Sequence, residues 1–347
     1  MKKINPGYIV RRLLGTLILP VLMYLAMMIL TYSNGKYFFG TWLMWKTVLA
    51  DLALTFTCAL GIGIQFKNGR FDFSGGSVML LSAILAGNIA QNSGSNRWLF
   101  FALCLGCCLM LNFLVSLLYI WGRMPIIITT ISAALLFEAV TCNIFNGAGI
   151  TLVANISLKA FSSFPLALLP MGIACAVYSF YSHLTVTGRQ SALLAQNQQA
   201  AVNIGINEKR NVIFSYLFGG IILGCATSIY ASTNILRGAF DSLSTVGALF
   251  TNILPVFVGL ILSAFCPDVI GILMGSLTLS IMSFGFQAVF SAEIGAALTI
   301  MLTGLFLLLL NVIAGQSGHG CRYDPPSSHP EADGCLISTL LTRRRIK

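Results

Sequence analysis

The chain has 347 residues, of which 57% are hydrophobic and only 9% are charged, and its formal net charge is +10. So small a share of charged residues excludes an ordinary soluble domain, in which about a quarter of the residues are charged. A bilayer core about 30 Å thick takes roughly 20 apolar residues per helix. The composition therefore indicates a polytopic membrane protein.

Apolar stretches of this length follow one another along most of the chain. We predict an all-α fold of about ten transmembrane helices at residues 11–32, 43–66, 73–91, 98–121, 125–145, 161–182, 212–231, 246–265, 268–290 and 292–314. The first stretch raises the alternative of a cleaved signal peptide. It is long enough to span a bilayer and lacks an A-x-A cleavage pattern, so we expect a retained helix.

Basic residues indicate how these helices are oriented. With the N-terminus inside, most of the 20 Lys and Arg residues fall on the cytoplasmic side, including Lys2, Lys3 and the run 343–345. Because cytoplasmic loops carry the excess of basic residues, an even number of spans and two cytoplasmic termini are predicted. The positive charge then reflects topology and contact with anionic lipids, and we expect no nucleic-acid partner.

Catalytic and cofactor motifs are missing from the sequence. It contains no G-x-x-x-x-G-K-[ST], no H-E-x-x-H and no G-x-S-x-G. We therefore expect no enzyme activity, no catalytic residue, no bound cofactor and no metal site. Asp51 lies in the second predicted span and Glu138 in the fifth, and either is a possible intramembrane polar site. A direct role in transport and a role in packing remain open for both.

A first polar interruption separates the second and third apolar stretches at residues 67–77. Its glycines allow a tight turn and close helix approach, and Asp72 or Ser74 is placed to cap the helix that follows. The segment is either a broken helix that lines a pathway, since irregular backbone at membrane depth must be buried or line a cavity, or a tight cytoplasmic turn.

A second polar interruption, residues 183–211, is the longest predicted cytoplasmic loop between spans. Its Ala, Leu and Gln residues favour a short helix, and Gly205 is a natural stop for it. Such a helix at the cytoplasmic face is either a docking surface for another protein or a folded connector.

Both interruptions resemble the permease subunits of ribose/xylose/arabinose-type ABC importers, which belong to the branched-chain amino acid/monosaccharide superfamily. The resemblance covers about residues 10–315. The family motif G-G-x-D-x-S-x-G-S is matched, with Arg70 at its second glycine, by Gly69, Asp72, Ser74, Gly76 and Ser77. The family's cytoplasmic G-R-x-x-x-A-x-G-x-N-x-x-A-A-x-x-x-G-I stretch is matched, with Ala195 replacing a glycine, by Gly188, Arg189, Asn197, Ala200, Ala201, Gly205 and Ile206.

This resemblance implies a type II importer-like permease domain at residues 1–315 and a cytoplasmic, disordered tail at 316–347. The first motif would belong to the pathway or a broken helix, and the second would be the coupling loop that docks ABC ATPase subunits. Further implied partners are a second permease, identical or not, and an extracytoplasmic solute-binding protein; ATP would bind to the ATPase. The expected function is import of a small polar solute, foremost a monosaccharide, across the bacterial inner membrane.

Other features depart from the family pattern. The region 258–271 has lost most of the glycines that relatives carry there, and Glu138 stands near a position that relatives fill with Arg. These differences indicate a divergent member. An ion-coupled secondary transporter or channel is the alternative function, which the few intramembrane acids support only thinly.

Overall fold

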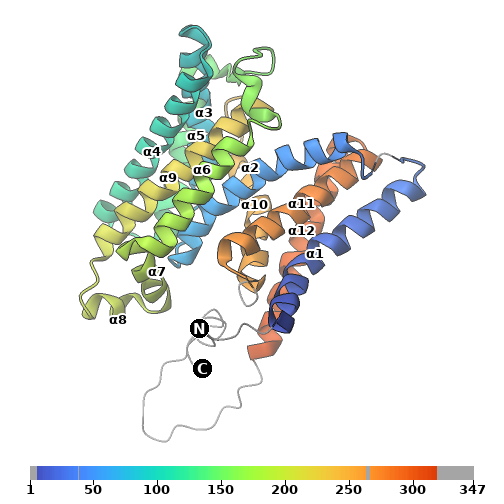
Figure 1. The fold of residues 1–347 in the computed structure, drawn as a ribbon. Coiled ribbons are helices and arrows are strands. Elements are labelled where there is room, and N and C mark those ends of the chain that lie inside the picture. The colour runs from blue at the N-terminus through green and yellow to red at the C-terminus, as the bar shows by residue number, and fades with distance from the viewer. Residues whose placement is uncertain (1–5, 38, 263–265, 319–347) are drawn as a thin grey trace, which may run out of the picture.

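The computed structural model describes residues 6–37, 39–262 and 266–318, and within these ranges the chain is almost entirely helical (Figure 1). The α-helices are α1 Pro6–Ser33, α2 Trp42–Lys67, α3 Gly75–Asn92, α4 Arg97–Gly122, α5 Ile126–Asn143, α6 Leu168–Ser179, α7 Val186–Gln196, α8 Gln198–Asn203, α9 Glu208–Thr233, α10 Ser244–Leu262, α11 Asp268–Val289 and α12 Ala292–Gly318. Short turns of helix are η1 Ile144–Gly147, η2 Lys159–Ser162 and η3 Phe180–Leu184. Two short antiparallel strands, β1 Ile150–Thr151 and β2 Ile235–Leu236, pair with each other.

Each predicted span falls on a helix of the described chain, and the all-α prediction is confirmed. The sixth span was predicted to start too early: α6 begins only at Leu168, because Pro165 and the preceding serines interrupt helical geometry. At the other end, α12 continues to Gly318, beyond the predicted domain end at 315. The predicted tail from residue 319 onward, and Lys2 and Lys3, lie outside the described residues.

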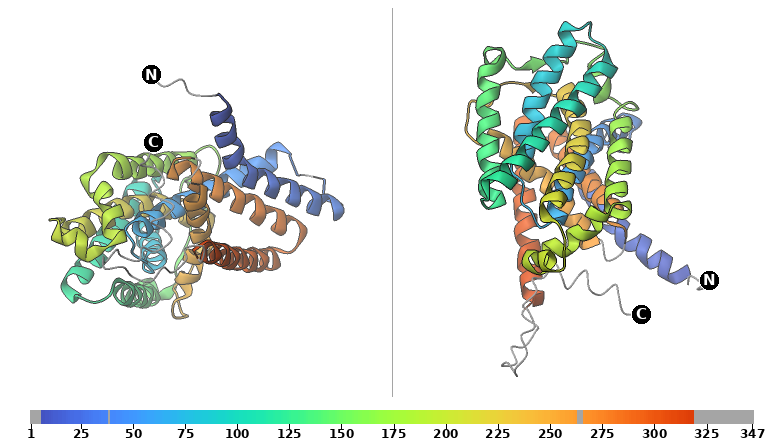
Figure 2. Two further views of the ribbon diagram at one scale, coloured as in Figure 1. Left: turned by 90° about the horizontal axis from the view of Figure 1, so that it is seen from below. Right: turned by 90° about the vertical axis from the view of Figure 1, so that its left-hand side faces the viewer.

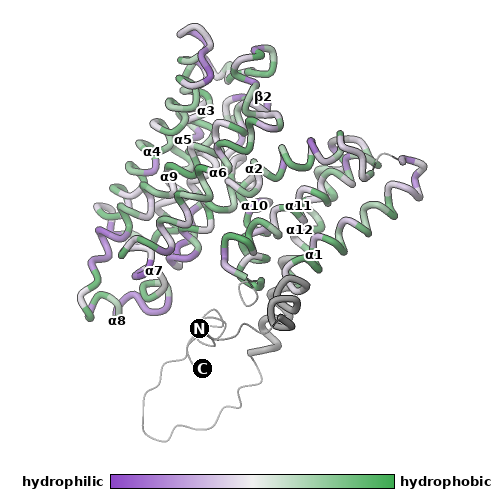
Figure 3. The backbone as a smooth tube through the Cα atoms, in the orientation of Figure 1, coloured by the Kyte–Doolittle hydropathy of each residue, from purple (hydrophilic) through white to green (hydrophobic). Residues whose placement is uncertain are grey.

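Seven helices of the described chain are long and apolar enough to cross a membrane, namely those in α1, α2, α4, α5, α9, α10 and α11. Shorter apolar segments occupy Leu168–Leu184 and Glu293–Phe306. Figure 3 shows hydrophobic colouring along the long helices and hydrophilic colouring concentrated around α7, α8 and the ends of helices. The fold is therefore that of a membrane protein, while the number of ten spans stays a prediction.

The long helices form two groups on either side of α2 and α10 (Figure 1). One group contains α3, α4, α5, α6 and α9, and the other contains α1, α11 and α12. The views in Figure 2 keep α1 and α12 away from α4 and α5. Helices α7 and α8 lie at one end of the first group. Since α2 contacts α6, α9, α10 and α11, it joins the two groups.

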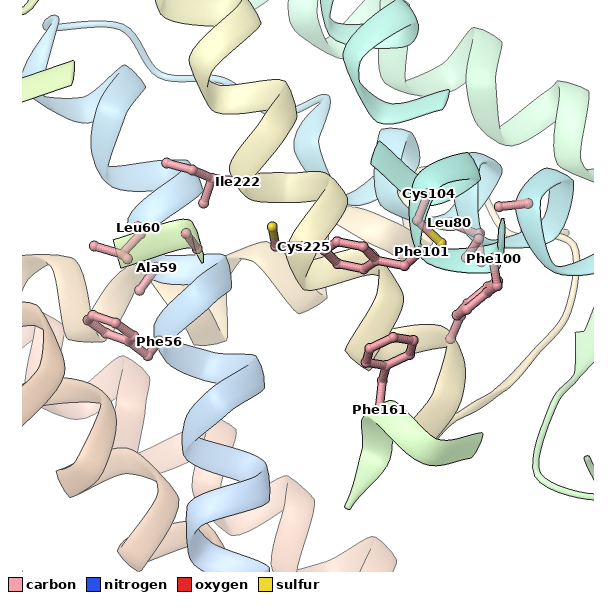
Figure 4. Close-up of a cluster of buried hydrophobic side chains, with 14 of the residues drawn as sticks. Phe56, Ala59, Leu60, Leu80, Phe100, Phe101, Cys104, Phe161, Ile222 and Cys225 are labelled. Carbon is pink, nitrogen blue, oxygen red and sulfur yellow. The ribbon is translucent and has the colours of Figure 1, made fainter. Parts of the chain in front are cut away.

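The largest apolar core fills the first group and reaches α2. Figure 4 shows Phe56 and Leu60 of α2, Phe101 and Cys104 of α4, and Ile222 of α9 among its members. Phe161 of η2 closes this core at one end, where its ring stacks on Phe101 at a centroid distance of 5.5 Å. Burying such aromatic and aliphatic groups fixes α2 against α4 and α9.

Small residues allow close contact between particular helices. A Cβ atom at Gly224 of α9 would lie 2.8 Å from the Cα atom of Leu105 in α4. Likewise, a Cβ atom at Gly271 of α11 would lie 2.8 Å from the carbonyl oxygen of Gly259 in α10. The few glycines that remain in the region 258–271 therefore hold α10 and α11 in direct backbone contact.

Candidate functional site: a polar cavity and the turns beside it

A cavity of about 490 Å³ lies between α2, α3, α9, α10, α11 and α12, beside the loop after β2. Its lining is mixed, with apolar side chains such as Leu54 and Met79 beside a similar number of polar ones. The polar lining residues are Asp51, Thr55, Tyr230, Asn234, Arg237, Ser244, Thr245, Thr251, Asn252, Ser283, Gln287 and Thr299. Pockets of roughly 300–1,000 Å³ with a few placed polar groups are typical of small-molecule sites.

Helix α2 contributes one continuous face to this cavity. Asp51, Thr55, Cys58 and Ile62 recur at intervals of three or four residues, which places them one above another on one side of a helix. The carboxylate of Asp51 interacts with the hydroxyl of Ser280 on α11. Of the two predicted intramembrane acids, Asp51 is the one that this cavity contains.

Glu138 is buried elsewhere, on α5, and is not among the residues that line this cavity. Its Oε2 atom accepts a hydrogen bond from the backbone N–H of Leu243 at 2.7 Å. Its Oε1 atom accepts from the backbone N–H of Thr245 at 2.9 Å and from that residue's hydroxyl at 2.6 Å. Because α10 begins at Ser244, the carboxylate satisfies amides that lack helical partners and faces the positive end of the helix dipole. In the structure, Glu138 is thus hydrogen-bonded to the start of α10.

The first sequence motif forms the turn between α2 and α3. Asp72 Oδ1 accepts from the backbone N–H of Ser74 at 2.8 Å and from its hydroxyl at 2.6 Å, so Asp72 rather than Ser74 supplies the cap. Removal from water raises the pKa of the Asp72 carboxyl, although the bonds from Ser74 oppose this. Ser77 is buried and its hydroxyl donates to the Ser74 carbonyl at 2.8 Å.

Glycines of this turn touch two other parts of the molecule. Gly69 has a positive φ of 70°, and a Cβ atom there would lie 3.0 Å from the Cα atom of Ala195 in α7. Gly76 lines the cavity, and a Cβ atom there would lie 2.5 Å from the carbonyl oxygen of Thr245 at the start of α10. The turn therefore contacts the loop around α7 at one end and the cavity wall at the other.

A buried arginine strengthens the link between the turn and the loop. Arg70 Nη1 lies 3.4 Å from Oδ1 of Asn211 and 3.3 Å from Oγ of Ser215, both on α9. Asn211 Nδ2 in turn donates to the carbonyl oxygen of Thr187 at 2.9 Å and lies 3.4 Å from Oγ of Ser191, both on α7. These contacts connect three elements through side chains that are shielded from water.

The second sequence motif forms two short helices where one was predicted. Asn197 ends α7 and begins α8, and its side chain accepts from the backbone N–H of Ala200 at 3.0 Å. Gly205, with φ of 94°, follows the end of α8, as predicted. Gly188 is needed because a Cβ atom there would meet the carbonyl oxygen of Tyr181 at 2.0 Å. Arg189 is exposed.

Two residues of this motif face the interior of the loop. Ala201 and Ile206 are buried in a small cluster with Leu194. The side chain of Ala201 therefore packs within the loop and is not part of its exposed surface. The described part of the loop exposes other large apolar side chains, namely Leu184, Val186, Leu193, Val202 and Ile204, and Ile204 is 71% exposed.

Sequence reasoning missed several residues of the site. In the sequence, Arg70 stood out only as a departure from the second glycine of the family motif. A charged residue between two apolar stretches nevertheless indicates a specific hydrogen-bonding partner. Ser283 and Gln287 stand four residues apart in an apolar helix, a spacing that places both on one face. No local pattern could have paired Glu138 with Thr245, since 107 residues separate them.

A bundle of long apolar helices around a cavity lined by both polar and apolar side chains fits a membrane permease. The chain belongs to the family described as branched-chain amino acid transport system / permease component, which it matches over residues 44–315. It is therefore a permease component of an ABC transporter family.

A curated relative narrows the comparison. The chain is 27% identical over 193 residues to the "Autoinducer 2 import system permease protein LsrC" of Enterobacter sp. (strain 638). The match covers 53% of this chain and 55% of the relative, so the chain spans about half the length of the curated relative that it matches.

Proposed function

We propose that the chain is the transmembrane permease subunit of an ATP-driven importer and forms the translocation pathway for a monosaccharide or a chemically similar solute. The single observation that carries this proposal is the cavity of about 490 Å³ enclosed by apolar helices in a member of a permease family. A small polar solute needs such a polar surface to replace its water inside the membrane.

The lining favours a neutral, hydroxyl-bearing solute. Hydroxyl and amide groups, such as those of Thr55, Asn252 and Gln287, both donate and accept hydrogen bonds. Leu54 and Met79 offer apolar surface to the carbon face of a ring. The similarity to a permease whose name refers to autoinducer 2 import supports a solute imported from outside the cell.

Docking of an ATPase subunit is assigned to the loop at residues 183–211. Its exposed apolar residues Leu193, Val202 and Ile204 lie beside polar and charged groups that include Arg189. Apolar centres with polar surroundings are typical of protein interfaces. Ala200, Gly205 and Asn197, which caps α8, belong to the same exposed surface, while Gly188, Ala201 and Ile206 are buried beneath it.

The proposed coupling runs from this loop to the cavity. A displacement of α7 is transmitted to Gly69 through Ala195 and to Arg70 through Asn211. The turn then acts on α10 where Gly76 meets Thr245. ATP binding to the partner would favour one of two arrangements of these contacts, and the difference in free energy between them would drive alternating access. The permease itself performs no covalent chemistry.

Further partners complete the proposed importer. They are a second permease, an ABC ATPase pair and an extracytoplasmic solute-binding protein, in the bacterial inner membrane with both permease termini in the cytoplasm. The basic residues of the sequence support this orientation.

Reconstitution tests the proposal. The complete complex is placed in proteoliposomes with ATP on the ATPase side, and uptake of radiolabelled pentoses and hexoses is measured with and without the binding protein. We expect uptake that requires both ATP and the binding protein. Uptake by the permease alone that follows an ion gradient without ATP would contradict the proposal and favour a secondary transporter.

A further inference from the structure

A second cavity of about 230 Å³ adjoins the one already described. The two cavities share four lining residues, namely Asp51, Leu54, Ser283 and Gln287. The second is also lined by Thr47, near the start of α2. Helix α2 rises about 1.5 Å per residue, so Thr47 lies about 30 Å from Lys67, whose Nζ contacts Ser182 near α7. The smaller cavity therefore lies toward the end of the molecule opposite the docking loop.

We infer that Asp51, Ser283 and Gln287 form a solute-recognition subsite at the junction of these two cavities, in which the Asp51 carboxylate accepts hydrogen bonds from hydroxyl groups of the solute. This inference rests on the proposed function and deepens it. These three side chains border both cavities, so a solute that moved from the smaller cavity to the larger one would pass beside them.

Asp51 has the capacity for such bonds. The two oxygens of its carboxyl group can accept hydrogen bonds from solute hydroxyl groups, and the interaction with Ser280 uses one donor. Among the described residues the ion pair found is Lys67 with Asp268, at 3.0 Å, so Asp51 takes part in no ion pair there; Arg237 is the basic residue that lines the same cavity. A carboxylate within apolar helices gains stability from additional donors, and adjacent hydroxyl groups of one solute can provide two of them.

Ser283 and Gln287 complete the subsite from α11. Gln287 Nε2 donates to Oγ of Ser283 at 2.9 Å, which fixes the amide and leaves its carbonyl oxygen as an acceptor. The Ser283 hydroxyl keeps its own proton to donate. One carboxylate beside a neutral amide and a hydroxyl suits a solute with several hydroxyl groups. A strongly cationic solute would need several carboxylates to balance its charge.

The test uses the complete complex in proteoliposomes, with radiolabelled pentoses and hexoses and their single-deoxy analogues as probes. The Asp51→Asn variant keeps the shape of the side chain but converts an acceptor oxygen into a donor. We expect the KM of transport to rise roughly tenfold or more, since hydrogen bonds to charged groups are among the stronger ones. Asp51→Glu should restore part of the affinity, and Asp241→Asn, an exposed acid outside both linings, serves as the control.

The deoxy analogues separate recognition from a structural effect. In the wild type, the KM for the analogue that lacks the recognised hydroxyl should be higher by a similar factor. In Asp51→Asn, removing the same hydroxyl from the solute should raise the KM little further, because the partner of that hydroxyl is already gone. A misplaced helix would weaken all analogues by the same factor.

Outcomes for the subsite and for the proposed function are distinct. ATP-dependent uptake by the wild type with an unchanged KM in Asp51→Asn would overturn the subsite alone. Fully additive losses, or a preference of the wild type for a cationic solute that Asp51→Asn abolishes, would also overturn it. A wild-type complex without ATP-dependent uptake would contradict the proposed function and the subsite with it.

Discussion

Replacing Glu138 tests whether a carboxylate on α5 holds the start of α10. In Glu138→Ala, the backbone amides of Leu243 and Thr245 lose their acceptor. The donors are only part-buried, so each of the three lost bonds, from the two amides and the Thr245 hydroxyl, costs about 1 kcal/mol, and the variant should be destabilised by about 3 kcal/mol. Glu138→Gln keeps one carbonyl oxygen and should lose about half as much.

Thermal unfolding of the detergent-solubilised permease measures this loss. One kcal/mol shifts Tm by roughly 2–4 °C for a domain of 150–250 residues, so we expect Glu138→Ala to lower the apparent Tm by at least about 5 °C. Glu293→Ala, at an exposed glutamate in the first turn of α12, is the matched control and should leave the apparent Tm nearly unchanged. An apparent Tm of Glu138→Ala equal to that of the control would refute the capping role.

Four further predictions concern coupling, folding and topology. Ile204→Glu should leave membrane levels normal but abolish co-purification of the ATPase, because it places a charge in the exposed apolar surface; retained co-purification would show that docking occurs elsewhere. Ala201→Glu should instead lower the level of folded permease on size-exclusion chromatography, since it buries a charge inside the loop. Arg70→Met should reduce ATP-dependent uptake more than ATPase co-purification, as the link to α9 is cut while the docking surface remains; equal loss of both would contradict this. A reporter inserted at Gln198 should register cytoplasm and one at Asn155 the outside, and a reversed pattern would refute the ten-span topology.

Helix positions were largely predictable because each rests on a local property. A continuous apolar run of about 20 residues predicts a spanning helix wherever it occurs, and α2, α4 and α11 lie within one or two residues of their predicted limits. The start of α6 was predicted too early because the apolar run extends back through η2 to residue 161. Pro165 interrupts helical geometry between η2 and α6.

The site was less predictable because its parts come from distant segments. The polar turn and the loop were found from composition, and Asp51 was found as an isolated acid in an apolar run. Whether that acid meets a cavity depends on how α2 faces α11, which no pattern within α2 determines. The burial of Ala201 could not be predicted either, because an alanine fits a packed cluster and an exposed surface equally well.

Contact between Gly259 and Gly271 restricts how the permease can move. Two helices whose backbones touch have no flexible side chains between them to absorb a shift, so α10 and α11 must travel as a single block. Asp268 at the start of α11 ties that block to Lys67 at the end of α2. A solute passing through the cavity would then meet one rigid wall, formed by α10 and α11. Opening and closing of the cavity would depend on movement of the helices that lie opposite this wall.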